Sequence, residues 1–407
     1  MEVVYRCCCG LDVHKKKIVA CLFKGRNKEV REIGTTTAEI RELADWLLTA
    51  GCEMVAMEST GAYWKPLYNI FEINGLNAMV VNAAHMKALP GRKTDVKDSE
   101  WIADLCRHGL LKASFIPNRE QRELREIARY RKSLTEERSR EWNRLHKILE
   151  GANIKITAVI DINTVSSKNL LNAIAADKDL NRDELLNLVQ GSVRKKVDQL
   201  LPAMDGIVTP LQRKLIRHIV DHIDDMTARI ADLDQLILLY MSEYESAIEK
   251  ISQVSGIARR NAEIILAEIG KDMDRFPTAA HLCSWAGVCP GNHESAGKRY
   301  SGKSTKGNKA LKSTLIQCAQ AAGKTKNTFF SAQLQRIAVR RGKKRATLAV
   351  AHSMLIAIYH ILKYNTDFHD LGSDYYDIYN RERKIKGHLK RLQALGWSPD
   401  DSAAVTA

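Results

Sequence analysis

Short, largely apolar runs alternate with turns and helical stretches in the N-terminal part of the chain, and this alternation limits the possible folds. Runs of strand length lie at residues 3–11, 18–23, 29–33, 54–57 and 78–81. Stretches with helical spacing of apolar residues lie at 37–50, 61–73 and 95–111. Short apolar runs bounded by turns indicate buried strands. The order of strands and helices therefore predicts a three-layer α/β domain with a mixed sheet.

A long helical region is expected next. Residues 118–151 have the composition of one long charged helix. Further along, apolar residues recur in alternating steps of three and four, at Ile216, Ile219, Ile223, Met226, Ile230, Leu233, Ile237 and Tyr240. This heptad repeat is typical of a coiled coil. Because heptads do not identify the partner helix, two interpretations stay open: an intramolecular hairpin with the 118–150 helix, or subunit assembly.

The remainder is expected to be mainly α-helical. Residues 251–270 predict two short helices around Gly256, a helix-hairpin-helix whose backbone amides would hold a phosphate, with a plain αα-corner as the alternative. A loop at 287–308 precedes helices expected at 309–322 and 328–364. The expected divisions are an α/β domain at 1–112, a helical coiled-coil region at 113–250, a mainly α domain at 251–372 and a charged tail at 373–407.

Positive charge is concentrated in one part of the chain, whose net charge is +15. Between Ser295 and Arg345 there are fourteen Lys or Arg residues and no Asp or Glu. Such a stretch repels itself unless a polyanion neutralises it, and nucleic acid is the ordinary partner. The cations expected to contact phosphates here are Lys298, Arg299, Lys303, Lys306, Lys309 and Lys312.

Composition also excludes several classes of protein. No run of eighteen apolar residues occurs, so no membrane-spanning helix is expected, and Asp12 interrupts the first apolar run, unlike a signal peptide. The nine cysteines form no C-x-x-C pair and no cluster with zinc spacing. Reduced thiols in a cytoplasmic protein are the expectation.

Four acidic residues suggest a catalytic centre. Asp12 ends one apolar strand, Glu58 ends another, and Asp95 and Asp98 lie on one face at the start of a helix. Singly, each has a structural explanation, either charge pairing or helix capping. Together they can meet at one sheet edge, where carboxylate oxygens suit Mg²⁺ or Mn²⁺ and the metal-assisted transfer of a phosphoryl group. Basic residues close to these acids would hold a DNA backbone: Lys15, Lys93 and Lys97.

The residues around these acids carry a family resemblance. The blocks GLDVHKK, MESTGAYW and GRKTDVKDSEWIADL resemble the catalytic blocks of the DEDD transposases of the insertion-sequence 110/1111 group. The segment FPTAAHLCSWAGVCPGNHESAGKRYSGKSTKGNKALKSTL is similar to the second domain of that family. The resemblance covers residues 5–112 and 250–360. It implies an RNase H-like (RuvC-like) fold for the first domain and matches Asp12, Glu58, Asp95 and Asp98 to the family's metal-binding acids.

The resemblance also implies an activity and partners. Members of this group cleave and rejoin the DNA of a mobile element and use a structured non-coding bridge RNA to choose target and donor DNA. They are expected to be homo-oligomers, dimers or tetramers, whose two domains meet across subunits. The expected location is the prokaryotic cytoplasm, in association with the nucleoid.

Ser295 is marked by the resemblance as a candidate nucleophile. A serine that attacks a phosphodiester would form a phosphoserine–DNA bond and conserve the bond for rejoining. Only His293 and Glu294 lie beside it in sequence, so metal-binding acids from another domain or subunit would be needed for activation. The alternative is a Gly/Ser loop that contacts phosphate without attacking it.

Other functions remain open. Residues 297–304, GKRYSGKS, match the phosphate-binding loop of nucleotide hydrolases, although polar residues precede them and Gly307 follows where a helix is required. A P-loop ATPase is therefore one alternative. A RuvC-like junction-resolving endonuclease that hydrolyses DNA is a second, and a non-catalytic nucleic-acid-binding protein is a third.

Overall fold

The computed structural model describes residues 2–59, 61–82, 95–290, 293–295, 297–302, 304, 306–379 and 381–396. At residues 95–97, 293–295, 299–301, 383 and 384 it describes the backbone but not the side chains. The chain divides into two compact units, Met1–Arg119 and Glu120–Ala407, and each is described by itself.

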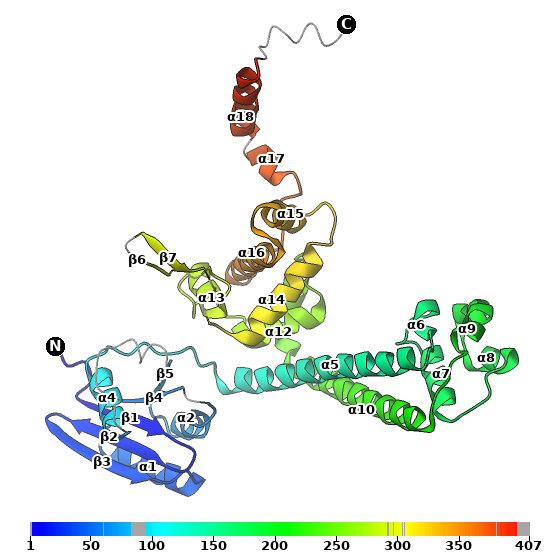
Figure 1. Cartoon of the computed structure of the whole chain (residues 1–407). Helices are drawn as coiled ribbons and strands as arrows, with labels where there is room; N and C mark the ends of the chain where they lie inside the picture. The colour runs from blue at the N-terminus through cyan, green and yellow to red at the C-terminus, as the bar shows by residue number, and fades with distance from the viewer. Residues whose placement is uncertain are drawn as a thin grey trace. The chain divides into compact units, whose positions relative to one another are not determined.

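The first unit is built on a five-stranded sheet. Its strands are β1 (Cys7–Val13), β2 (Ile18–Lys24), β3 (Asn27–Ile33), β4 (Met54–Glu58) and β5 (Ala78–Val81). The spatial order is β3-β2-β1-β4-β5, with β2 antiparallel to its two neighbours and β1, β4 and β5 parallel (Figure 1). The predicted mixed α/β sheet is confirmed, and it fits an RNase H-like domain. The first strand begins at Cys7 and not at Val3, which lies exposed before it.

Helices cover the two faces of this sheet. The side of Cys9 and Leu11 packs with α1 (Thr37–Thr49) and α2 (Trp64–Ile73). The side of Cys8 packs with α4 (Asp95–Arg107). Successive residues of a strand point to opposite faces, so a strand buried on both sides has an almost continuous apolar sequence. This explains the apolar run CCCGL in β1, which is buried throughout.

The second unit begins with a long antiparallel helical hairpin of α5 (Arg119–Gly151) and α10 (Pro210–Tyr240). Arg131 pairs with Asp234 and Arg138 with Thr227, so residue numbers rise along one helix as they fall along the other. Thr209 caps α10 through a capping box. The buried heptad positions are Ile216, Ile223, Met226, Ile230, Leu233 and Ile237. In this structure these positions pack within the chain, as the hairpin interpretation expects.

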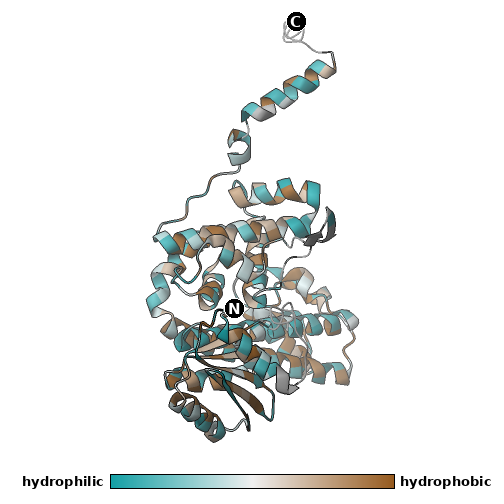
Figure 2. Cartoon of the chain, turned by 90° about the vertical axis from the view of Figure 1, so that its left-hand side faces the viewer, coloured by the Kyte–Doolittle hydropathy of each residue, from teal (hydrophilic) through white to brown (hydrophobic). Residues whose placement is uncertain are grey.

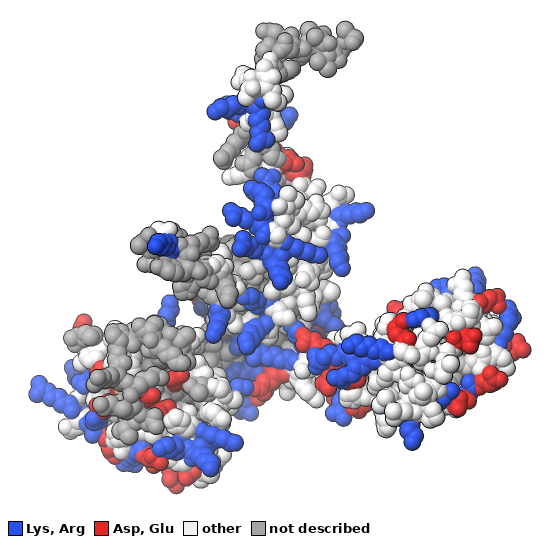
Figure 3. Space-filling model, viewed as in Figure 1, with Lys and Arg blue, Asp and Glu red and all other residues white. Residues whose placement is uncertain are grey.

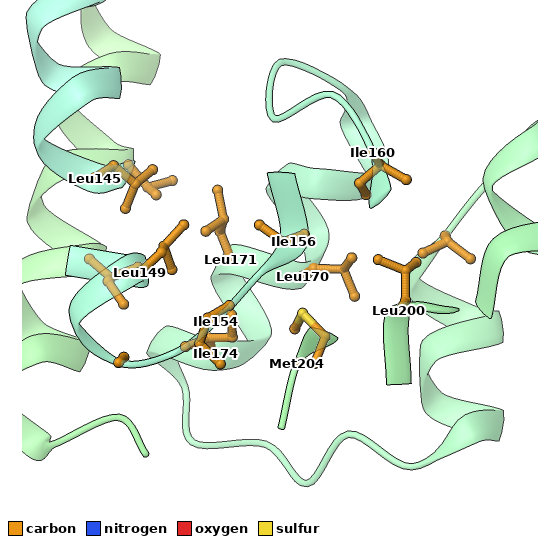
Figure 4. Close-up of a cluster of buried hydrophobic side chains, with 14 of the residues drawn as sticks. Leu145, Leu149, Ile154, Ile156, Ile160, Leu170, Leu171, Ile174, Leu200 and Met204 are labelled. Atoms are coloured by element: carbon orange, nitrogen blue, oxygen red, sulfur yellow. The ribbon is translucent and has the colours of Figure 1, made fainter. Parts of the chain in front are cut away.

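A small helical subdomain is inserted in the sequence between α5 and α10. It contains α6 (Ile156–Val159), α7 (Val165–Ala175), α8 (Arg182–Leu188), η1 (Gly191–Lys196) and α9 (Val197–Ala203). Figure 4 shows its core, in which Leu170, Leu171 and Leu200 belong to one cluster of buried side chains with Leu145 and Leu149 of α5. Because these leucines are almost fully buried, the subdomain is anchored firmly to the end of the hairpin.

A helical bundle follows. Its elements are η2 (Ser242–Tyr244), α11 (Glu245–Ser252), α12 (Arg259–Ile269), α13 (Ala279–Ala286), α14 (Lys309–Ala322), α15 (Phe329–Arg341) and α16 (Lys343–Tyr364), with the hairpin of β6 (His293–Ser295) and β7 (Lys298–Ser301) between α13 and α14. By length and composition α16 could cross a membrane, but half of its apolar window is buried. It packs against α11, α13, α14 and α15, as the core helix of a bundle does.

The C-terminal region differs from the sequence prediction in two respects. The helix expected at 328–364 is broken into α15 and α16 at Gly342, whose φ of +80° is incompatible with a continuous helix. The loop expected at 287–308 contains the β6–β7 hairpin. The charged tail carries α17 (Tyr375–Tyr379) and α18 (Arg381–Ala394). Figure 2 shows apolar residues among the hydrophilic ones of α18, and Ile385, Leu389 and Leu392 of this helix are exposed.

Candidate functional site

Asp12 and Glu58 lie on neighbouring parallel strands. Leu11 of β1 is in register with Met57 of β4, so the next residues, Asp12 and Glu58, lie next to each other at the carboxyl ends of the two strands. Gly10 and Ala56 precede them by two residues and are also in register. Since alternate residues share a face, Asp12 and Glu58 belong to the face on which Ala56 packs with α4.

The helix α4 brings a third acid to this face. A Cβ atom on Gly10 would overlap the backbone oxygen of Ser99 and the backbone nitrogen of Ala103, so α4 packs directly on β1. Cys8, on the same face, has its Sγ 3.5 Å from the carbonyl oxygen of Ala103. Asp98 immediately precedes Ser99. It therefore lies on the same side of the sheet as Asp12 and Glu58.

Asp12 is in an electrostatically unfavourable position. Burial raises its pKa, and the neighbouring charges of Asp98 and Glu58 raise it further. The opposing influence is His14, whose Nε2 lies 3.0 Å from Asp12 Oδ2 and lowers the pKa. Carboxylates that repel one another in a half-buried position favour a bound cation.

The chemistry of these side chains suits a hard divalent cation, because carboxylate oxygens are the ligands that Mg²⁺ and Mn²⁺ prefer. Asp95 lies at the first position of α4, but its side chain and that of Lys97 are outside the described part of the chain, as is the whole of Lys93. Among the side chains that are described, no three His, Cys, Asp or Glu residues converge closely enough to form a metal site. Lys15 is exposed in the turn after β1.

Ser295 lies in the second unit, at the end of β6, where it pairs with Lys298 of β7. Its side chain is outside the described residues. The β6–β7 hairpin is also incompatible with the phosphate-binding loop of nucleotide hydrolases, because that motif requires a loop between a strand and a helix. Here Lys298–Ser301 form a strand inside the matching segment, and α14 does not begin until Lys309. The local structure that an ATPase motif needs is therefore not formed.

The basic region is a largely exposed surface of the helical bundle. Figure 3 shows Lys and Arg side chains gathered on the bundle. Lys298, Lys306 and Lys309 are exposed. Lys312 is partly buried and donates from Nζ to Ser304 Oγ at 2.6 Å. Arg299 and Lys303 have no described side chains. Further exposed cations lie around Gly342, at the junction of α15 and α16, which we call the Gly342 elbow. The sequence analysis did not identify them individually: Arg336, Arg340, Arg341, Lys343, Lys344 and Arg345.

Gly256 lies in the turn between α11 and α12. Its φ of +88° favours glycine, and a Cβ atom there would overlap backbone atoms of Cys318 and Ala322 in α14. Two helices flank the turn, but α11 (Glu245–Ser252) lies mostly before the segment at 251–270 in which the pair was expected, whereas α12 (Arg259–Ile269) lies within it. The glycine has a packing role in this turn. Phosphate binding by this turn stays a prediction.

Sequence reasoning missed a buried ionic network in the second unit. Arg131 of α5 is 3% exposed and binds Glu263 of α12 at 2.7 Å, and Glu268, 1% exposed, binds Arg129 at 2.6 Å. The sequence did contain a pattern from which this network could have been predicted. Glu263 and Glu268 interrupt the apolar sequence of α12, and Arg131 lies on the apolar stripe of α5, where a charged residue requires a partner.

Comparisons with known proteins agree with this architecture of a mixed α/β domain followed by a basic helical bundle. A family model for DEDD transposases of the IS110 type, described as "Transposase", matches residues 9–154. A second model, "Transposase IS116/IS110/IS902 family", matches residues 248–335. A search of curated proteins finds no match. The fold and the two matches define the protein as a transposase. It belongs to the IS110 group of DEDD transposases.

Proposed function

We propose that this transposase cleaves and rejoins DNA at an acidic centre formed by Asp12, Glu58, Asp95 and Asp98. One observation supports this proposal most directly. Asp12 and Glu58 end neighbouring parallel strands on the face of the sheet that α4 covers, and α4 carries the other two acids. Had the two strand-end acids faced away from α4, the four could not act together.

The four acids would hold Mg²⁺ or Mn²⁺. Bound there, the metal would supply charge neutralisation for an attacking oxygen and a leaving oxygen in phosphoryl transfer. The protein's own groups have separate tasks. His14 fixes the orientation of the Asp12 carboxylate. Lys15, Lys93 and Lys97 would bind the DNA backbone, because cations beside an acidic centre offset its repulsion of phosphates.

Ser295 is the proposed nucleophile. Its Oγ would form a bond to the scissile phosphorus while the bond from phosphorus to one DNA oxygen breaks, so that a phosphoserine intermediate keeps the phosphodiester energy for rejoining. The surrounding cations, Lys298, Arg299, Lys303, Lys306, Lys309 and Lys312, would bind phosphates on either side. This assignment is supported by the position of the serine at the head of an acid-free basic region.

The proposed partners are those that the family resemblance implies. The proposed nucleic acids are the element ends, the target DNA and a non-coding bridge RNA, with the turn at Gly256 as a further phosphate contact. The proposed assembly is a homo-oligomer, a dimer or tetramer. We place the protein in the prokaryotic cytoplasm, at the nucleoid.

A covalent adduct tests the proposal. The protein is incubated with element-end DNA, Mg²⁺ and the RNA that co-purifies with it, and a protein–DNA adduct is sought on a denaturing gel. The adduct is expected with the unmodified protein and lost in both Asp98→Ala and Ser295→Ala. Products with only free 5′-phosphate and 3′-hydroxyl ends would contradict the serine mechanism.

A hydrolytic junction-resolving endonuclease is the second candidate. It is favoured by the fact that all four proposed acids lie in the first unit, so that a hydrolytic centre would need no residue of the second unit. For such an enzyme Ser295→Ala would leave strand cleavage intact, whereas Asp12→Asn would abolish it. A protein that only binds nucleic acid would lose no activity with either substitution.

A further inference from the structure

Glu268 is the most completely buried acid of the second unit among the residues described, with 1% of its surface exposed. Arg129 binds its carboxylate with two nitrogens, at 2.6 and 2.8 Å, and Arg125 Nε lies at 3.5 Å. Asn308 donates to it from Nδ2 at 2.5 Å. An unpaired buried carboxylate is strongly unfavourable. The side chains of Arg129, Arg125 and Asn308 are therefore held in place by their contacts with Glu268.

Asn308 lies where the loop that carries Ser295 ends. It is the N-cap of α14, since its side-chain oxygen accepts from the backbone N–H of Leu311 at 3.1 Å. Its own backbone N–H donates to the carbonyl oxygen of Trp285, in the last turn of α13, at 3.2 Å. Gly307 packs so closely on Gly287 that a Cβ atom would overlap it. The two ends of the loop at 287–308 therefore meet at one point.

The same network reaches the other end of the loop. The guanidinium group of Arg125 lies 5.7 Å from the ring centroid of Trp285 and donates to the carbonyl oxygen of Ala267 at 3.3 Å. Burial lowers the pKa of Arg125 to about 10, so the residue remains charged at neutral pH. Arginines of α5 and the carboxylate of α12 thus contact both residues that close the loop, Trp285 and Asn308.

We propose that Glu268 is a positioning residue for strand cleavage. Through Asn308 it fixes the base of the loop at 287–308, so that the β6–β7 hairpin presents Ser295 in one direction. The inference rests on the proposed role of Ser295. Stability alone does not require such an arrangement, because well-packed apolar residues usually serve as well as a buried ion pair. A misplacement of the reacting group of about 1 Å, by contrast, lowers a rate roughly a hundredfold.

Glu263 provides a comparison within the same helix. It is 6% exposed and binds Arg131 at 2.7 Å and Arg259 at 3.1 Å. Its contacts join α5 and α12, and none of them reaches a residue of the loop that the structure describes. Substitution of either acid removes buried ion pairs, whereas only Glu268 contacts Asn308.

The decisive variant is Asn308→Ser. Serine caps a helix about as well as asparagine, but it is too short to reach Glu268. We expect unchanged DNA affinity and nearly unchanged thermal stability, with the rate of adduct formation at saturating DNA lowered between roughly tenfold and a hundredfold. Asn181→Ser, at the N-cap of α8, is the matched control and is expected to leave this rate unchanged.

Limited proteolysis gives a readout that does not depend on the chemistry of the serine. Trypsin sites at Lys298, Arg299 and Lys303 lie in the loop. They are expected to be cut faster in Asn308→Ser and Glu268→Gln than in Glu263→Gln. Wild-type adduct and proteolysis rates in Asn308→Ser would overturn the inference, as would equal effects of the two glutamate substitutions. If Ser295→Ala still cleaves DNA, the nucleophile proposal fails, but the proteolysis result continues to test whether Glu268 holds the loop.

Discussion

Asp12 shows how a single side chain links stability to activity. Its pKa in the folded protein is raised by burial and by the charges of Asp98 and Glu58. The folded state therefore binds this proton more tightly than the unfolded state does. The stabilisation that this gives is complete at low pH and disappears as the pH rises through the raised pKa. At neutral pH the ionised carboxylate consequently destabilises the metal-free protein.

Asp12→Asn is expected to raise the free energy of unfolding of the metal-free protein at neutral pH, because the amide cannot ionise. The difference should shrink as the pH falls toward the ordinary pKa of aspartate, about 3.9. Urea unfolding at several pH values, with a chelator present, measures it. DNA cleavage by this variant should be abolished, and added Mg²⁺ should stabilise only the unmodified protein. Equal or lower stability of the variant at neutral pH would contradict this account.

Gly10 is the second residue whose role is specific, because the backbone of α4 occupies the space of a side chain. Gly10→Ala is expected to lower the free energy of unfolding by about 1–3 kcal/mol through overpacking. It should also lower cleavage activity in the fraction that remains folded, since α4 must move away from Asp12. Gly387→Ala is the control, because its Cβ atom would meet no other atom. Chemical denaturation and a cleavage assay measure the two effects.

At the scale of elements, the α5–α10 hairpin explains the heptad repeat. Ile230 is 2% exposed and packs with Leu134 and Leu233, whereas Leu239, on the same helix, is 70% exposed. Ile230→Ala is expected to lower the free energy of unfolding by about 2–5 kcal/mol, and Leu239→Ala to change it little.

Dilution separates the two interpretations of that repeat. If the seam packs within one chain, the free energies of unfolding of the unmodified protein and of Ile230→Ala are the same at every protein concentration. If the seam joined subunits, the apparent stability of both proteins would fall as the protein is diluted. Denaturation at several concentrations, together with sedimentation of the folded protein, makes the comparison.

At the scale of the whole molecule, the acid-free basic surface predicts salt-dependent binding of nucleic acid. Replacing Lys343, Lys344 and Arg345 together with glutamine is expected to weaken binding of DNA without regard to its sequence. The slope of log K against log salt should become shallower by about 0.9 for each phosphate of the duplex that the protein no longer neutralises. Replacing Lys178, Arg194 and Lys195, in the small helical subdomain, is the matched control. If the triple variant at Lys343, Lys344 and Arg345 kept the slope of the unmodified protein, these residues would be excluded from the binding surface.

The sequence predicted elements better than it predicted their ends. Periodicity located all five strands of the sheet, the long helices α5 and α10, and the helix α12 that follows Gly256, because apolar spacing follows the face that is buried. It joined α15 and α16 across Gly342 and did not find the β6–β7 hairpin. A single glycine and a hairpin rich in cations leave no apolar pattern to detect.

The sequence by itself determined the alternation of strands and helices, the acids at the strand ends and the position of the basic region, since each of these is a property of neighbouring residues. Only the tertiary structure decided that Asp12 and Glu58 share a face with α4, that the heptad seam packs within the chain, and that Glu268 reaches Asn308. These contacts join residues distant in sequence. They depend on strand register and helix packing, which local patterns do not specify.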